Sequence, residues 1–257
     1  MSILHQIRLG PLTSAMCKDA GCEGQNGFPS NQTWADEVER VLSFLQVQGQ
    51  FERYLPMLRG TLTQRDGAFA EARVAFFFHR NGFSIVSWEP RGLSNKLGEF
   101  EIQWPDTQPI FVEVKCPRWE GELNDAEKKG PRRQQPRYIN AEARWVDPVE
   151  RVIYEAGKAA PKFLPNKPNL LVVAVYLLFL TPRELPQNIV EPMIRSALSD
   201  KKFTTIGGIM IFDTLYKGDS VNYEIVFINN CSAEPLCAIP EIVAKGLLEA
   251  NKTGFLR

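Results

Sequence analysis

The chain has 257 residues, which is enough for one large domain or for a core with extensions. Hydrophobic residues make up 44% of the chain and charged residues 23%, an ordinary globular composition that excludes a disordered protein. The formal net charge is +0, so the chain has no overall basic field. Any nucleic acid would have to be attracted by a local basic patch.

The cysteines and the apolar runs indicate the cellular compartment of the protein. The five cysteines are an odd number, and Met1–Gly10 has no long apolar stretch, so we expect reduced thiols in a cytoplasmic protein. The most apolar run is Leu170–Leu180. It is too short to span a bilayer, which takes about 20 residues, so it predicts a buried strand and no membrane association.

The first part of the chain is predicted to be helical. Met1–Gln32 is rich in polar and small residues and predicts an irregular arm. Apolar residues at helical spacing then predict a helix at Trp34–Gln50 and a shorter helix near Phe51–Arg59. Asp66 is the expected N-cap of a third helix, which should end near Asn81-Gly82.

Three strands follow, at Phe83–Trp88, Leu97–Trp104 and Ile110–Lys115. Pro105–Pro109 predicts a turn that joins the last two strands into a hairpin. A polar, charged segment comes next, at Cys116–Trp145.

The remaining elements alternate between helix and strand. Asp147-Pro148 is expected to open a helix to about Ala160, because proline suits a first helical position. The later predictions are a strand at Leu170–Leu180, a helix at Asn188–Leu198, strands near Thr205–Phe212 and Tyr223–Ile228, and a helix at Pro240–Asn251. This order predicts an α/β fold with a central mixed sheet flanked by helices. We expect an N-terminal arm with helices at 1–65 and an α/β domain at 66–257, or a single domain overall.

The two faces of the predicted hairpin differ in character. Because side chains alternate along a strand, one face is apolar, and the other carries Glu99, Glu101, Glu113 and Lys115. A symmetric turn would place Glu101 near Glu113 and Glu99 near Lys115. Carboxylates at 4 Å repel by about 1 kcal/mol in water and by more when partly buried. A divalent cation would relieve this repulsion, and Mg²⁺ prefers oxygen ligands of this kind.

A second interpretation stays open from the residues alone. Alternating Glu and Lys is typical of the solvated face of an antiparallel sheet. The acid-any-lysine pattern also occurs at Glu127–Lys129 and Asp200–Lys202, in polar runs where a solvated surface is favoured.

The hairpin sequence resembles a known family. Gly98-Glu-Phe-Glu-Ile102 followed by Phe111-Val-Glu-Val-Lys115 is similar to the signature of the PD-(D/E)XK nuclease superfamily. The resemblance covers about Asp66 to Leu180. It implies a restriction-endonuclease-like core in the order α-β-β-β-α-β, which is also the order of the predicted elements.

The resemblance implies roles for individual residues. Glu99, Glu113 and Lys115 would be catalytic, and Mg²⁺ or Mn²⁺ would be the cofactor. The superfamily usually has Pro-Asp where this chain has Gly98-Glu99, so Glu101 is an alternative first ligand. The metal ligands implied are Glu99, Glu113, Glu101 and Glu71.

Basic residues after the hairpin suggest contacts to nucleic acid. Their cations neutralise phosphates, and nearby aromatic side chains stack on bases. The residues expected in this role are Lys128, Lys129, Arg132, Arg133 and Arg137, with Lys158 added by the resemblance. A solvated polar loop is the alternative interpretation.

The expected function is therefore a Mg²⁺-dependent phosphodiesterase acting on DNA, an endonuclease in particular. The two histidines in the chain argue against histidine-based nucleases and Ser-His-Asp chemistry. One alternative is an inactive scaffold of the same fold that binds nucleic acid or protein. An RNA-directed nuclease or toxin is another, and a homodimer is left open.

Overall fold

The computed structural model describes residues 7–18, 32–117, 143–174, 187–217 and 220–253. The chain forms two compact units. The first comprises Met1–Arg80 with Thr214–Tyr223, and the second comprises Asn81–Asp213 with Glu224–Arg257. The predicted domain boundary after residue 65 stays a prediction.

The first unit contains four helices among the described residues: α1 (Pro11–Cys17), α2 (Gln32–Val47), α3 (Phe51–Leu58) and α4 (Leu62–Arg80). The prediction of an irregular arm is wrong at α1. Pro11 starts this helix, and the Glu39 carboxylate accepts hydrogen bonds from the Leu12 and Thr13 backbone N–H groups, at 3.2 and 2.8 Å. A distant carboxylate thus satisfies N–H groups that a helix start leaves unpaired.

The α4 helix begins before the predicted N-cap at Asp66. The Gln64 side chain accepts a hydrogen bond from the Thr61 N–H at 2.9 Å, and the Thr61 hydroxyl accepts one from the Gln64 N–H at 3.4 Å. This reciprocal pair is a capping box, and it starts the helix at Leu62. The helix ends as predicted, with Gly82 at φ 87° just beyond it.

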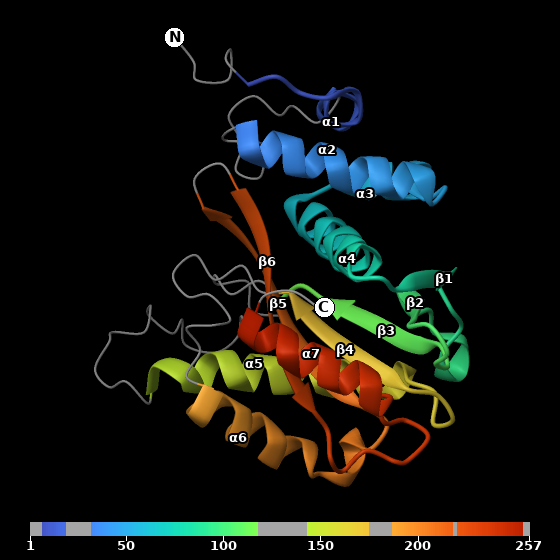
Figure 1. Ribbon diagram of the computed structural model, residues 1–257, viewed down its shortest axis with the longest axis vertical. Coiled ribbons are helices and arrows are strands. Elements are labelled where there is room, and N and C mark those ends of the chain that lie inside the picture. The colour runs from blue at the N-terminus through green and yellow to red at the C-terminus, as the bar shows by residue number, and fades with distance from the viewer. Residues whose placement is uncertain (1–6, 19–31, 118–142, 175–186, 218–219, 254–257) are drawn as a thin grey trace. The chain divides into compact units, whose positions relative to one another are not determined.

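A six-stranded mixed sheet runs in the order β1-β2-β3-β4-β5-β6, as Figure 1 shows. The strands are β1 (Ser84–Trp88), β2 (Phe100–Gln103), β3 (Ile110–Lys115), β4 (Asn169–Ala174), β5 (Gly208–Lys217) and β6 (Ser220–Asn229). The β1–β2 and β2–β3 pairs are antiparallel, whereas β3–β4 and β4–β5 are parallel. The α/β class with one central mixed sheet is therefore confirmed.

The second unit also contains helices. They are α5 (Ala143–Ala159), α6 (Gln187–Leu198) and α7 (Glu241–Thr253), together with the short 3-10 turns η2 (Leu93–Asn95), η4 (Ala160–Lys162) and η6 (Lys201–Phe203). The predicted order of helix, three strands, helix and strand is found in α4, β1, β2, β3, α5 and β4. None of the helices in the described ranges combines the length and apolar character needed to cross a membrane.

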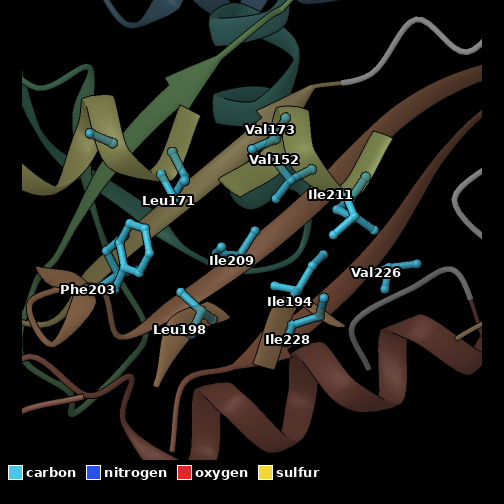
Figure 2. Packing of buried hydrophobic residues seen from close by; sticks show 14 of the residues in the cluster. Val152, Leu171, Val173, Ile194, Leu198, Phe203, Ile209, Ile211, Val226 and Ile228 are labelled. Atoms are coloured by element: carbon cyan, nitrogen blue, oxygen red, sulfur yellow. The ribbon is translucent and has the colours of Figure 1, made fainter. Parts of the chain in front are cut away.

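One face of the sheet packs against α5 and α6. Figure 2 shows side chains from β4, β5 and β6 meeting those of both helices. Leu171 and Ile209 come from the sheet, Val152 from α5 and Ile194 from α6, and all four are buried. Because β3 and β4 pair in parallel, the connection between them carries the helix α5, which covers this face. The β4 strand is buried at every position.

Candidate functional site

Glu113 of β3 is a charged residue in the interior. Its side chain is 0% exposed. The Lys115 ammonium contacts its Oε1 atom, and the Lys162 Nζ atom lies 2.5 Å from the same oxygen. The other carboxylate oxygen, Oε2, is buried and has no hydrogen-bond partner among the described residues. A solvated sheet face is therefore wrong for Glu113, because α5 and η4 cover the face that the sequence left open.

Lys115 is a protonated lysine in an acidic surrounding. Burial alone would lower its pKa, but Glu113 raises it through charge and a hydrogen bond, and Glu99 and Glu155 raise it further. The net pKa of Lys115 is raised above its ordinary value of 10.5. At neutral pH this side chain is an ammonium that donates and cannot accept a proton.

Glu99 lies beside Glu113 at the entry of β2. Its backbone N–H donates to the Val112 carbonyl oxygen at 3.2 Å, next to Glu113 in sequence. Its side chain is half-buried, and its charge acts on Lys115. Gly98 before it is required by packing, because a β-carbon there would overlap the Phe111 ring. This contact gives a physical reason for a glycine directly before Glu99.

The predicted register of the hairpin is wrong. Glu101 stands opposite Phe111 and not near Glu113, because the turn is not symmetric about the predicted centre. The Glu101 carboxylate instead pairs with Lys167, with Oε1 2.5 Å from Nζ. Among the described contacts, Glu101 thus has a cation partner of its own, and its role as a metal ligand stays a prediction.

The α5 helix adds a third carboxylate. Glu155 is buried, and its charge contributes to the raised pKa of Lys115. Lys158, predicted to contact nucleic acid, is exposed and lies with Nζ 3.1 Å from Glu155 Oε2. The structure thus brings Glu99, Glu113, Lys115 and Glu155 into one electrostatic group.

Sequence reasoning missed Glu155 and Lys162. Glu155 had a signal, because it interrupts the apolar face formed by Val149, Val152, Ala156 and Ala159. A charged residue at such a core-facing position requires a partner. Lys162 had no comparable signal, since only the tertiary fold places η4 beside β3.

The roles of the other predicted site residues stay predictions. Glu71 is half-buried in α4 and belongs to the first unit. The basic residues Lys128, Lys129, Arg132, Arg133 and Arg137 lie outside the described residues.

The capacity of the site to hold a cation depends on its carboxylate oxygens. No three His, Cys, Asp or Glu side chains within the described ranges are gathered closely enough to hold a metal. The donor chemistry nevertheless fits Mg²⁺, because Glu113 Oε2 is a buried carboxylate oxygen that lacks a hydrogen-bond donor in this part of the chain. An unpaired buried oxygen of this kind costs about 1–3 kcal/mol, which a cation would offset.

Comparisons with known proteins do not assign the chain to a family. No protein-family model matches the chain, and no curated protein matches it. A solved structure, SfsA of Pyrococcus furiosus in complex with Ca²⁺, matches at 18% identity with a TM-score of 0.27. The match covers 65% of this chain and 62% of SfsA, and a likeness this low carries no argument about fold or function.

Proposed function

We propose that this protein is a metal-dependent phosphodiesterase of the PD-(D/E)XK type, with a restriction-endonuclease-like core, that cleaves DNA internally. The observation that carries the proposal is the Glu113 carboxylate, which is fully buried, held on one oxygen by two lysines and unpartnered on the other within the described residues. Ionised groups are held in an interior at a cost in stability, and such groups gather at functional sites.

Glu113 and Glu99 would hold the Mg²⁺ or Mn²⁺ ion, with Glu101 and Glu71 as further predicted ligands. When bound, the ion would lower the pKa of a water molecule and offset charge on the phosphate under attack. The buried position of Glu113 prevents it from turning into solvent, so the carboxylate stays oriented between β3 and η4.

The two lysines supply positive charge for the reaction. Lys115 is protonated because of its acidic neighbours, so it can donate to an attacking water or to a phosphate oxygen but cannot act as a base. Lys162 lies on the same carboxylate oxygen with Nζ at 2.5 Å, and its side chain is 23% exposed. It can therefore reach a phosphate without leaving the site.

The test is plasmid cleavage in Mg²⁺ by the full chain. Lys115→Ala should lower the cleavage rate about a hundredfold to a thousandfold, as loss of one charge-stabilising donor does. Lys201→Ala, at an exposed lysine of η6, is the control and should cleave like wild type. Equal cleavage by wild type and Lys115→Ala would overturn the proposal.

A specific observation supports a second candidate function. The described residues include no gathered set of three metal ligands, and two lysines already neutralise Glu113. A scaffold that binds nucleic acid or protein without metal has these features. Calorimetric titration with Mn²⁺ separates the candidates, because heat of binding that Glu113→Gln abolishes supports the enzyme, and its absence supports the scaffold.

A further inference from the structure

Glu89–Gly98, which makes up all but the last residue of the connection between β1 and β2, forms a loop that we name the β1–β2 loop. Two large apolar side chains project from it, with Leu93 45% and Leu97 48% exposed. Two cationic residues, Arg91 and Lys96, are also exposed on the same loop. Apolar groups alternate with cations over seven residues, so this surface combines two chemically distinct contacts.

The loop is held in one shape by its own backbone. The Gly92 N–H donates to Lys96 O at 2.7 Å, and the Gly98 N–H donates to Pro90 O at 2.9 Å. Ser94 and Asn95 both have φ 58°, a left-handed conformation that costs non-glycine residues about 1–3 kcal/mol each. Strain of this size persists only where surrounding contacts maintain it.

The β1–β2 loop lies next to the electrostatic group that contains Glu99 and Glu113. Lys162 Nζ lies 3.4 Å from Leu97 O and 2.5 Å from Glu113 Oε1, so a single ammonium joins the loop to the buried carboxylate. Glu99 follows the loop directly in sequence. Gly92 packs against the Lys162 carbonyl so closely that a β-carbon would overlap it.

We infer that the β1–β2 loop docks duplex DNA beside the site, with Leu93 and Leu97 against the base steps and Arg91 and Lys96 on the flanking phosphates. This inference rests on the proposed function, since it places the scissile strand near Glu113. Cations on a loop complement the phosphate backbone, and apolar side chains that enter the minor groove unstack base steps. A loop that already forms its own backbone hydrogen bonds should lose less conformational entropy on binding than an unstructured segment.

Binding is measured with the full chain and a short labelled duplex in EDTA, so that no cleavage occurs. Arg91→Ala/Lys96→Ala should weaken binding about tenfold and reduce the slope of log affinity against log salt by about 2. Leu93→Ser/Leu97→Ser should weaken binding about tenfold with the slope unchanged. It should also abolish the emission rise of a fluorescent base analogue that reports unstacking.

The control is Leu236→Ser/Lys201→Ala, at an exposed leucine and an exposed lysine elsewhere in the second unit. It should bind like wild type. All these side chains are exposed, so circular dichroism should show unchanged folding for every variant. Loop variants that bind the duplex like wild type would overturn the inference, as would a wild type that prefers single strands. A wild type with no affinity for DNA would also overturn it and would favour a protein partner for the loop.

A second assay distinguishes failure of this inference from failure of the proposed function. Hydrolysis of a small aryl phosphodiester in Mn²⁺ reports the site alone, and both loop variants should retain the wild-type rate. If wild type cleaves DNA but the loop variants bind normally, only the inference fails. If the loop variants lose binding while wild type hydrolyses neither substrate, only the proposed catalytic function fails.

Discussion

A buried carboxylate governs the candidate site at the scale of single residues. Glu113 is excluded from solvent, and its charge is compensated by Lys115 and Lys162 on one oxygen. Buried charges are tolerated when paired, and removal of a partner leaves an uncompensated charge. The lysines therefore contribute to folding as well as to the proposed chemistry, and the two contributions can be measured separately.

Lys162→Met should lower the free energy of unfolding by about 1–3 kcal/mol, because Glu113 then loses one of the two lysines that pair with it among the described residues. Urea denaturation measures the change, and Lys201→Met is the matched control with an expected change within about 0.5 kcal/mol. In the double variant Glu113→Gln/Lys162→Met, most of the loss should disappear. If Lys162→Met lowers the free energy of unfolding by the same amount in Glu113→Gln as in wild type, Lys162 does not act through Glu113.

The pKa of Lys115 predicts how this stabilisation depends on pH. A lysine whose pKa is raised on folding stabilises the folded state fully below its unfolded value, here 10.5, and loses that contribution as pH rises through the folded value. The difference in unfolding free energy between wild type and Lys115→Met should therefore stay constant from neutral pH to about 10 and shrink above 10.5. A decrease already near neutral pH would contradict the raised pKa.

At the scale of elements, the register of the strands places the site. The sequence correctly assigns Glu113 and Lys115 to the second strand of a hairpin, because alternation along β3 is a local property. Glu99, predicted inside the strand Leu97–Trp104, lies one residue before β2. It does not give the pairing of Glu101 with Phe111, because the register depends on turn geometry. It also misses the burial of Phe111 and Glu113, which follows from parallel pairing with β4 and cover by α5.

Gly98→Ala tests the close packing between the β1–β2 loop and β3. The added β-carbon would overlap the Phe111 ring, which itself packs edge-on against Phe163 with centroids 5.8 Å apart. We expect a loss of about 1–3 kcal/mol in unfolding free energy and weaker cleavage, because Glu99 would shift. Gly157→Ala is the control, since nothing lies within 4 Å of its β-carbon position. It should raise stability by about 0.5–1 kcal/mol, as alanine does in a helix.

At the scale of the whole molecule, a buried ionic network ties distant segments of the first unit together. Arg73 of α4 donates twice to the Glu37 carboxylate of α2, at 2.9 and 2.8 Å. The Tyr223 hydroxyl of β6 donates to the same carboxylate at 2.7 Å across 186 positions of sequence. The tip of the β5–β6 hairpin is therefore part of the helical unit, although its base belongs to the second unit.

Arg73→Met should destabilise the chain by about 3–5 kcal/mol, because it removes the Arg73 guanidinium that pairs with the buried Glu37 carboxylate. The double variant Glu37→Met/Arg73→Met should recover most of that loss, since it removes both charges. Arg40→Met, at an exposed arginine of α2, is the control. Chemical denaturation of all variants measures the changes, and an Arg73→Met variant as stable as the control would show that the network is not needed for folding.

The sequence by itself determined the α/β class, the order of the main helices and strands after α1, and the strand that carries Glu113 and Lys115, because periodicity and turn residues act over a few positions. Only the tertiary structure decided that Glu113 is buried, that Lys162 joins it, and that Glu101 pairs with Lys167. These contacts join residues 49 and 66 positions apart. They depend on parallel strand pairing and helix packing, which no local pattern of residues specifies.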